Sequence, residues 1–593
     1  MTGGLYAALA LVFCAPLFRL PHGVGVGDWD QHLFYYASVL KNVVEYGAAP
    51  FWNPWYCGGN VLWANPQVAL LSPVYPIALV TSLPLAMKVT IVLHYVVGLV
   101  GMHLLLRRVI GLRSLVVVVY LASVFTLSGA HALHLAVGHS TFLPAFLFPL
   151  QLFWVLRAIE HGRLKYVFGA AALLALMIYG GGMHVVPMAL TGIGGFSAFA
   201  AVLQRSRRPL VLVTVLVAAG LAYAGPKLVP VTLFVGGNQF FDTRGGMDRS
   251  DFMTPEMLVH AYITPYQDLT PAFDDQRHGW HEYGNFTGAL FGLLFMASLV
   301  WVGTARRAPD RRLGQSFGGT AVLLLFFSAG EFAPVAPASL ARLLPFFSSY
   351  RIPSRFTIVF VLFAVMTVAW VWRQLAAQID PRQSRGFVAV VCVLATAELV
   401  IWNGSWFRDV FSQPPLASTF AWGAGPRTLA YEVNADPFSG QSPMLRALMN
   451  DRSFVDCYEP LQLDRTSNSE RPLVWTDGRA TIFDTWFSPN EVSFSVLGSD
   501  RPATVVLNTN YAPGWRSTLG PIRFDETQPG PSAMMPADQG GRHAFTYVPE
   551  GLWVGLGALA VALAGSVWGW RRTLPASKRG TSRSPIITRG DLT

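Results

Sequence analysis

The chain has 593 residues, of which 52% are hydrophobic and 13% are charged, and its mean hydropathy is +0.41. Soluble proteins carry charge on about 25% of their residues, so this composition excludes the soluble class and predicts a membrane protein. The net charge of +10 does not indicate nucleic-acid binding, because many Lys and Arg residues fall in short clusters between apolar stretches. Such clusters are typical of the cytoplasmic loops of membrane proteins.

Apolar runs of roughly 17 to 22 residues recur along the chain, and a helix of that length crosses a hydrocarbon core of about 30 Å. Basic loops alternate with uncharged or acidic ones, at 107–113, 157–165, 205–208, 305–312, 373–385 and 571–580. Placing these basic loops in the cytoplasm predicts about twelve transmembrane helices with both termini inside. The predicted spans are 5–20, 87–106, 114–133, 141–157, 166–183, 185–203, 210–232, 286–304, 316–330, 355–372, 387–402 and 551–570.

This topology places four long segments outside, at 21–86, 233–285, 331–354 and 403–550. Within the first of them, the apolar stretch 66–85 carries four prolines, which predicts a re-entrant or interfacial helix and not a thirteenth span.

From about residue 403 the composition shifts to Asp, Arg, Ser, Thr and Pro, with alternating runs at 479–487, 491–498 and 503–511. Such runs predict strands, and hence a β-rich extracytoplasmic domain. The predicted organisation is a transmembrane domain with outer loops, the β-rich domain, a final helix and a basic cytoplasmic tail, at 1–402, 403–550, 551–570 and 571–593.

The four cysteines, Cys14, Cys57, Cys392 and Cys457, show no metal-finger spacing, so no zinc site is predicted. A disulfide between Cys57 and Cys457 remains an alternative if both residues face outward.

Two acids, Asp28 and Asp30, follow the first apolar run in the stretch GDWDQHLFYY. Acids at a membrane are costly unless they meet water, a cavity or a partner, so the pair suggests a functional site. Simple solvation at the aqueous interface is the alternative. The D-x-D pattern also matches sites in which two carboxylates bind a divalent metal.

Arg351 and Arg355 are four residues apart and share one face if a helix begins before them. Guanidinium groups bind phosphate through charge-assisted hydrogen bonds, so both are candidates for a phosphate site. The alternatives are contact with lipid headgroups or an ion pair with Glu331 or an acid of 233–285. Lys227, near the outer end of the seventh predicted span, is a third phosphate candidate.

Residues 45–76 are rich in aromatic, Asn, Pro and Gly residues, and here the sequence resembles the YfhO family of bacterial membrane proteins. The matching motifs are G-D-x-x-Q, P-x-W-N-P, G-G, A-N-P-Q, R-x-P-x-R-F and Y-x-P-G-W. In this chain they fall on Gly27, Asp28 and Gln31, on Pro50, Trp52, Asn53 and Pro54, on Gly58 and Gly59, on Ala64, Asn65, Pro66 and Gln67, on Arg351, Pro353, Arg355 and Phe356, and on Tyr511, Pro513, Gly514 and Trp515. The chain departs from the family after His184, where a Pro-Gln pair is missing.

This resemblance implies the GT-C superfold of membrane glycosyltransferases, in a bacterial inner membrane. It implies transfer of a sugar from a polyprenyl-phosphate donor to an extracytoplasmic glycan, glycolipid or protein, with inversion. Asp28 is the expected catalytic base and Asp30 the second choice, and no cofactor is required unless a divalent metal binds these two carboxylates. The implied substrate contacts are Gln31, Trp52, Asn53, Asn65, Gln67 and His184.

Two other classes remain open. A transporter or lipid flippase is expected to carry ionisable residues near the bilayer midplane and related halves, and a scaffold would use the β-rich domain to bind glycan or a partner. Some candidate residues also have simpler roles. Tryptophans such as Trp52 form interfacial belts as an alternative to contacting substrate. The outer histidines His131, His134 and His139 are expected to hydrogen-bond more readily than to bind metal.

Overall fold

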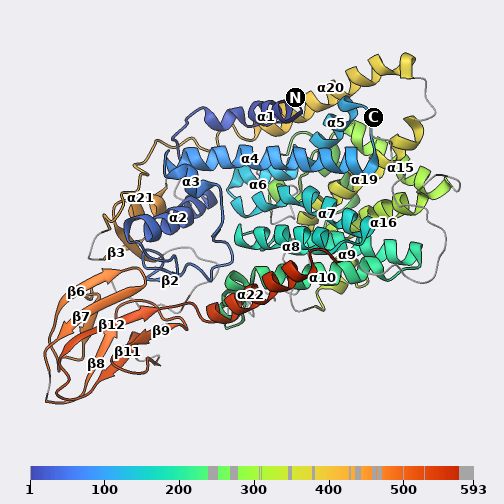
Figure 1. Cartoon of the computed structure of the whole chain (residues 1–593). Coiled ribbons are helices and arrows are strands. Elements are labelled where there is room, and N and C mark those ends of the chain that lie inside the picture. Colours follow the sequence, from blue (N-terminus) through green and yellow to red (C-terminus); the bar gives the residue numbers. More distant parts are fainter. Residues whose placement is uncertain are drawn as a thin grey trace.

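In the computed structural model of the protein, helices run side by side and a β-rich domain lies at one end (Figure 1). The structure describes residues 2–237, 252–267, 278–344, 347, 350, 352–376, 381–456, 463 and 470–572, apart from 306–307, 309, 426–428, 435–441, 499 and 526–527.

The helical part is that of a multi-pass membrane protein. Among the described residues, seven helices are long and apolar enough to cross a membrane, or eight if one bent pair counts as a span. The helices of this part are α1 (Thr2–Cys14), α4 (Leu83–Leu104), α5 (Leu115–Thr126), α6 (Gly129–Val137), α7 (Phe148–His161), α8 (Leu164–Tyr179), α9 (Val185–Gln204), α10 (Arg208–Tyr223), α11 (Gly225–Gly236), α15 (Ala289–Thr304), α16 (Arg311–Ser328), α19 (Thr357–Ala376), α20 (Pro381–Ser405) and α22 (Leu552–Gly569). Short helical segments join them: η1 (Ala15–Phe18), η3 (Leu105–Ile110), η4 (Ser140–Leu147), α13 (Pro255–Ile263), α14 (Trp280–Tyr283), α17 (Pro337–Ala341) and η5 (Pro353–Phe356).

Helix α19 forms the centre of this bundle. Its sequence is apolar on every side, and 94% of its most apolar window is buried. The corresponding share is 22% in α20 and in α22. A helix that is apolar all round must be covered by other helices or by lipid, so α19 is covered by protein while α20 and α22 present most of their surface to the membrane.

A helix lies at each of the twelve predicted spans, but the count of twelve stays a prediction. Three of the helical segments, Thr2–Phe18, Leu164–Tyr179 and Ala289–Thr304, are shorter than a full span. Helix α16, which begins with Arg311 and Arg312, is not among the seven.

Two helices, α10 and α11, lie at the span predicted at 210–232. Helices α10 and α11 are bent by 82° at a break between Tyr223 and Gly225. Pro226 has no N–H group to continue the hydrogen-bond ladder of a helix. Gly225 also lies directly against Gly555 of α22, where a Cβ atom would stand 2.7 Å from the Gly555 carbonyl oxygen. The break therefore lets α11 pack closely on α22.

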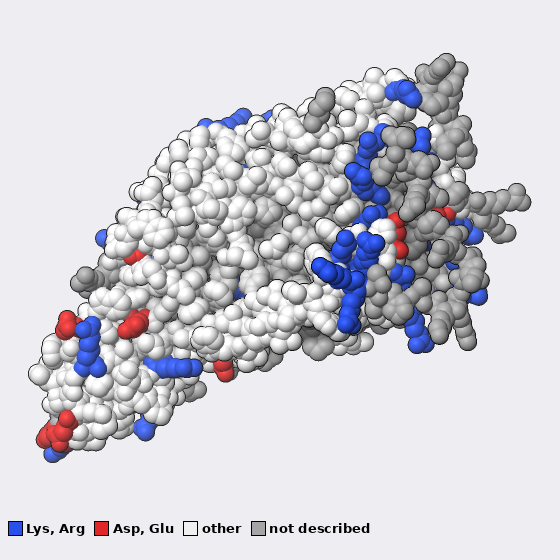
Figure 2. Space-filling view, viewed as in Figure 1, with Lys and Arg blue, Asp and Glu red and all other residues white. Residues whose placement is uncertain are grey.

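Basic residues gather at the end of the bundle away from the β-rich domain (Figure 2). Loops that are distant in sequence meet there: the Leu164 N–H donates to the Arg572 carbonyl at 3.2 Å, and Gly162 lies against the Arg208 guanidinium. This grouping agrees with the loop charges that predict the cytoplasmic side.

The first outer segment folds over the other end of the bundle. It contains α2 (Asp28–Leu40), the π-helical turn η2 (Lys41–Glu45), the antiparallel pair β1 (Trp52–Asn53) and β2 (Asn60–Val61), and α3 (Val74–Ala78). Every residue of α2 after Asp28 is buried. The proline-containing stretch 66–85 holds only the five-residue helix α3 before α4 begins, so it adds no span.

The β-rich domain contains two antiparallel sheets, in the strand orders β10-β11-β8-β5 and β6-β7-β12-β9. Their alternating inward residues, such as Phe494, Val505 and Phe545, are buried. The strands are β5 (Val474–Thr476), β6 (Ile482–Ser488), β7 (Glu491–Val496), β8 (Ala503–Leu507), β9 (Trp515–Ser517), β10 (Arg523–Asp525), β11 (Gln528–Met535) and β12 (Gly541–Tyr547). Strands β6, β7 and β8 confirm the three strand predictions. A separate parallel pair, β3 (Ala430–Asn434) and β4 (Arg452–Asp456), flanks helix α21 (Pro443–Met449).

The motif-rich loop 49–61 joins the two parts of the molecule. Trp52 is 1% exposed and packs against Trp515 and Tyr547 of the β-rich domain, with ring centroids 5.2 and 4.8 Å apart. The Asn510 backbone N–H donates to the Gly58 carbonyl at 2.9 Å. Two motifs that are far apart in sequence, P-x-W-N-P and Y-x-P-G-W, thus meet at one interface.

Cys57, in the same loop, is disulfide-bonded, whereas Cys14 and Cys392 are buried free thiols. Cys457, the partner that the sequence leaves open for Cys57, lies outside the described residues.

Candidate functional site

Asp28 occupies the first turn of α2, and its position is fixed by close backbone contacts. Gly27, before the helix, has φ of +59°, a conformation that favours glycine. Gly138, with φ of +108°, lies against α2 so closely that a Cβ atom would stand 2.4 Å from the Trp29 nitrogen and 2.8 Å from the Asp28 Cβ. The Trp29 indole N–H donates to the Leu135 carbonyl at 2.8 Å. The end of α6 therefore holds the start of α2.

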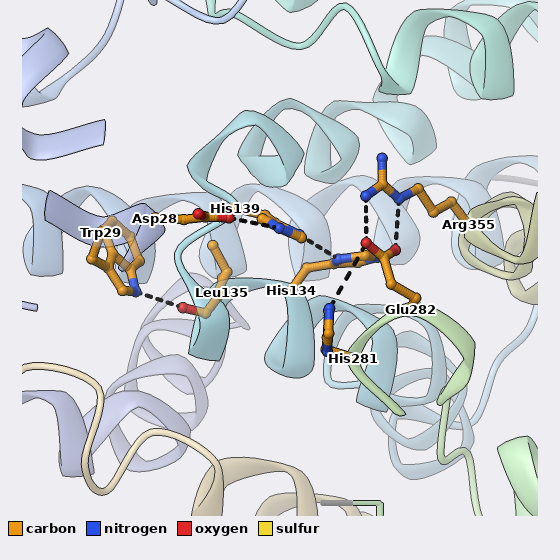
Figure 3. A network of polar contacts seen from close by, with 8 residues as sticks. All are labelled: Asp28, Trp29, His134, Leu135, His139, His281, Glu282 and Arg355. Atoms are coloured by element: carbon orange, nitrogen blue, oxygen red, sulfur yellow. Dashed lines mark hydrogen bonds and ion pairs between the residues drawn. The ribbon is translucent and has the colours of Figure 1, made fainter. Parts of the chain in front are cut away.

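This contact sets Asp28 beside two histidines (Figure 3). The Asp28 Oδ2 lies 3.0 Å from the His139 Nε2, and the His139 Nδ1 lies 3.0 Å from the His134 Nδ1. The Asp28 side chain is 30% exposed and that of His139 is 16% exposed. Burial favours the neutral acid, but the His139 hydrogen bond and the surrounding histidines outweigh it and lower the pKa of Asp28. Asp28 is therefore ionised at neutral pH and reachable from solvent.

Behind the histidines lies a buried ion pair. Arg355 donates from Nε and Nη2 to the two carboxylate oxygens of Glu282, at 2.7 and 2.5 Å. Burial opposes ionisation of Glu282, yet Arg355 holds the pKa of this carboxyl well below its usual range. The pairing matches the alternative in which a candidate arginine binds an acid of 233–285. The His281 Nε2 lies 3.9 Å from the Glu282 Oε1.

Two more histidines complete what we call the polar cluster. The His184 ring lies parallel to Phe142, with centroids 6.3 Å apart, and Phe142 also carries the Arg355 guanidinium over its ring. His32, one turn along α2, interacts electrostatically with Asp28. Burial lowers the pKa of His32 and of His281 to about 4, so both are neutral at neutral pH. The cluster consists of Asp28, His32, His134, His139, His184, His281, Glu282 and Arg355.

Asp30 points away from this cluster. Its carboxylate is fully buried and accepts the backbone N–H groups of Met444 and Leu445, at 2.9 and 3.0 Å, in the first turn of α21. Residues two apart on a helix do not face each other, so the carboxylates of the D-x-D pattern meet different elements. Among the described residues, no group of three or more His, Cys, Asp and Glu side chains is placed to hold a metal ion.

The other predicted phosphate ligands are placed differently. Lys227 is buried, and its ammonium donates to the Trp63, Asn65 and Val68 carbonyls at 2.8, 2.7 and 3.1 Å. An ammonium has three N–H donors, so these contacts use all of them to hold the outer loop. Arg351 lies outside the described residues, and the helical segment begins after it, at Pro353.

The remaining predicted contacts lie in the first outer segment and not in the polar cluster. Gln31 donates to the Tyr35 and Tyr56 hydroxyls at 3.1 and 2.7 Å. Asn53 donates to the Ser38 hydroxyl, and the Asn65 side chain accepts the backbone N–H of Gln67. Of the predicted site residues, the structure brings together Asp28, Arg355 and His184.

A long apolar groove begins at the far end of α2. Its volume is about 1770 Å³, and it runs from the loop 49–51, past Val39 and Leu40 of α2, between α8 and α22, to Trp570 and Arg571. A smaller cavity of about 360 Å³ shares the walls Leu71 and Leu176 with it. Tyr36 lines this smaller cavity and hydrogen-bonds Ser140, which follows His139. The smaller cavity thus adjoins the groove, and Tyr36 connects its wall to the residue after His139.

Sequence reasoning gave no site role to His139, His281 and Glu282. His139 is noted only among the outer histidines, although it contacts an acid 111 positions earlier in the chain. His281 and Glu282 open the stretch HEYGNFTGALF. Glu282 precedes an apolar run and Asp28 follows one, so an acid at the edge of an apolar run is the signal that both share.

No protein-family model matches the chain, and no curated protein matches it either. Among solved structures, the chain is similar to the arabinofuranosyltransferase AftD from Mycobacteria, with a TM-score of 0.43 and 14% identity over 69% of this chain and 27% of AftD. A mutant of AftD gives a TM-score of 0.41 and 16% identity over 68% of this chain and 28% of the other. The chain thus spans about a quarter of the length of these structures. At these TM-scores the likeness does not establish a common fold, and the site is interpreted from its own geometry.

Proposed function

We propose that this protein is a membrane glycosyltransferase that moves a sugar from a polyprenyl-phosphate donor to an extracytoplasmic acceptor. One observation carries the proposal: a single helix, α2, presents an ionised, accessible Asp28 at its start and lines a long apolar groove at its end. A site of this form suits a substrate with a reactive polar head and a long apolar tail.

The dimensions fit such a substrate. Asp28 and Val39 are eleven residues apart on α2, which is roughly 16 Å at about 1.5 Å per residue. A phosphate-linked sugar and the first units of its lipid can cover this distance, passing Tyr36 and the smaller cavity. The groove volume of about 1770 Å³ exceeds the roughly 300–1,000 Å³ of an ordinary small-ligand pocket, as a long isoprenoid chain requires.

Asp28 is the proposed catalytic base. The acceptor hydroxyl oxygen attacks the anomeric carbon of the sugar and gives its proton to the Asp28 carboxylate. The bond between the anomeric carbon and the phosphate oxygen breaks, and the lipid phosphate leaves with the electron pair. A single displacement of this kind inverts the anomeric configuration.

Arg355 is the proposed ligand of the departing phosphate, since guanidinium groups bind phosphate through charge-assisted hydrogen bonds. Glu282 and Phe142 fix its position beside the histidines. The resemblance to the YfhO family, and through it to the GT-C superfold, supports Asp28 and Arg355 in these roles and a bacterial inner-membrane location. We leave Asp30 and Lys227 out of the chemistry because their partners are backbone groups, of the first turn of α21 for Asp30 and of the first outer segment for Lys227.

The groove argues against a lipid flippase. A flippase must carry a polar headgroup across the membrane, which requires polar or charged groups along the path. Between its two ends the described groove is lined mainly by apolar and aromatic side chains.

The test is sugar transfer by the purified protein in lipid, with a panel of radiolabelled polyprenyl-phosphate sugars and an envelope extract as acceptor. We expect Asp28→Asn to lose about 10²- to 10⁴-fold in turnover, the usual contribution of a general base. The control is Asp409→Asn, an exposed acid beyond the end of α20, which should transfer like the wild type.

Wild-type turnover by folded Asp28→Asn would remove Asp28 as the base. If the wild type transferred no sugar from any donor in the panel, the glycosyltransferase proposal itself would be wrong, and the transporter and scaffold classes would return.

A further inference from the structure

His139 and His134 form a hydrogen-bonded pair whose outer end meets Asp28. The chain of contacts runs from the Asp28 Oδ2 through both nitrogens of His139 to the His134 Nδ1, with two steps of 3.0 Å. Exposure falls along it, from 30% at Asp28 to 16% at His139 and 1% at His134. The proposed base is thus connected to the protein interior by one chain of contacts.

The tautomers of the two rings are linked by this geometry. Asp28 is ionised and only accepts, so the His139 Nε2 carries the proton of their hydrogen bond. In a neutral ring the His139 Nδ1 must then accept, and the His134 Nδ1 must donate to it. The His134 hydrogen bond therefore selects the tautomer in which His139 donates to Asp28.

Both rings are held rigidly. His134 is stacked on Phe142, with centroids 3.9 Å apart and planes 9° apart. The His139 backbone N–H donates to the His134 carbonyl at 2.9 Å, and Gly138 holds the intervening loop against α2. A rigid donor on Oδ2 fixes the carboxylate plane, so that Oδ1 keeps one direction.

We propose that His139 is the positioning residue for Asp28 and that His134 sets the tautomer in which it acts. This inference rests on the proposed function, since it assigns Oδ1 to the acceptor hydroxyl and Oδ2 to His139. The reaction itself is unchanged: Oδ1 takes the acceptor proton, and His139 keeps its own.

The charged and titratable groups around the pair belong to several elements. They are Asp28 and His32 on α2, His184 before α9, His281 and Glu282 on α14, and Arg355 on η5. Because His32 and His281 also lower the pKa of Asp28, each variant must be compared with a histidine change that leaves the surrounding groups in place. His131 is the residue for this control. This buried histidine packs on Phe125 and Phe146, and neither of its ring nitrogens has a hydrogen-bond partner in the described part of the chain.

The first test is the pH profile of sugar transfer. Removing the donor in His139→Leu should lower kcat by about 10²-fold through misplacement of Asp28 and should move the acid limb up by about one to two pH units. His139→Gln, whose amide nitrogen can replace Nε2, should recover most of both losses. His134→Asn should resemble the wild type, His134→Leu should resemble His139→Leu, and His131→Leu should leave the acid limb unchanged.

The second test needs no activity. We would compare the melting temperatures of the wild type, Asp28→Asn, His139→Leu and the double variant between pH 3 and pH 8. Ionised Asp28 stabilises the fold above its lowered pKa, so the Asp28→Asn effect should be large at pH 7, fade as the pH falls, and be smaller throughout in the His139→Leu background.

An unchanged acid limb in His139→Leu, or a His139→Gln variant as impaired as His139→Leu, would overturn the inference. So would additive effects of the two changes on melting temperature. If no donor supports transfer at all, the proposed function fails while the melting data still decide whether His139 holds Asp28.

Discussion

At the scale of single residues, the position of Asp28 depends on the absence of a side chain at Gly138. In Gly138→Ala the new Cβ would stand 2.4 Å from the Trp29 nitrogen and 2.7 Å from the Asp28 carbonyl carbon. Backbone atoms cannot give way easily, so the start of α2 must shift. A shift of about 1 Å in a catalytic group lowers turnover roughly 100-fold, and we expect this loss in kcat at saturating donor.

A matched control is Gly111→Ala at the basic end. Gly111 also has positive φ, +82°, but a Cβ atom there meets nothing within 4 Å. Gly111→Ala should therefore cost only the backbone strain of about 1–3 kcal/mol. This cost should appear as a lower melting temperature with normal turnover. Equal turnover in the two variants would show that Gly138 does not set the site.

The sequence indicates Asp28, Arg355 and His184, but it does not indicate the histidine that contacts Asp28. Asp28 is conspicuous because charge is rare in this chain, and Arg355 and His184 follow from the motif resemblance. The hydrogen bond between Asp28 and His139 joins residues from two elements, and no spacing along the chain encodes it. For the same reason the sequence cannot show that Lys227 binds three loop carbonyls and not a phosphate.

At the scale of elements, α2 is anchored on two sides, at α6 by Trp29 and at α21 by Asp30. Burial raises the pKa of Asp30 from 3.8 to about 7, although the Leu445 and Met444 N–H groups favour its ionised form. Between pH 4 and pH 7 the folded protein therefore binds a proton that the unfolded chain has lost. Stability must fall as pH rises through this range.

We predict that Asp30→Asn reduces this pH dependence. The drop in melting temperature between pH 5 and pH 8 should be smaller in the variant than in the wild type, as measured by thermal unfolding in lipid. Asp538→Asn is a suitable control, because Asp538 is exposed and Asn tolerates its positive φ. An identical drop in Asp30→Asn and the wild type would contradict a buried, proton-binding Asp30.

The groove between α8 and α22 gives a prediction about donor length. Ala172 lines the groove and has an exposed side chain, so Ala172→Trp fills part of it. Overpacking of about 1–3 kcal/mol corresponds to a roughly 5- to 160-fold rise in KM for a long polyprenyl donor. A donor with only a few isoprene units should be unaffected.

Val300→Trp is the control for the groove, since Val300 on α15 is 67% exposed and does not line it. A similar rise in KM in both variants, or for both donor lengths, would argue that the tail binds elsewhere.

At the scale of the whole molecule, apolar runs and basic loops were enough to predict where the helices lie and which loops group together. They could not predict the bend of α10 and α11, because it depends on the close contact of Gly225 with Gly555 of a distant helix. Nor could they show why residues 45–76 are so rich in aromatic and small residues. Trp52, an implied substrate contact with an interfacial belt as its alternative, packs on Trp515 and Tyr547 and joins the two parts of the molecule.

The orientation of the whole molecule can be tested by cysteine labelling. The β-rich domain and the basic loops lie at opposite ends of the bundle (Figures 1 and 2), and the excess of Lys and Arg predicts that the basic end is cytoplasmic. Asp500 in the β-rich domain and Arg207 between α9 and α10 are both exposed, so each can carry a reporter thiol. Among the described cysteines, Cys14 and Cys392 are buried and Cys57 is disulfide-bonded, so none of these three should react.

With a membrane-impermeant maleimide on spheroplasts, we expect Asp500→Cys to be labelled at once and Arg207→Cys only after permeabilisation, with the wild type as the blank. The opposite pattern would put Asp28 on the cytoplasmic side, where an extracytoplasmic acceptor cannot reach it. Labelling of both thiols before permeabilisation, in cells shown to be intact, would mean that the two ends do not lie on opposite sides of the membrane. The expected pattern would place the Asp28 end of the groove on the outer face, where a lipid-linked donor in the membrane meets an acceptor from outside.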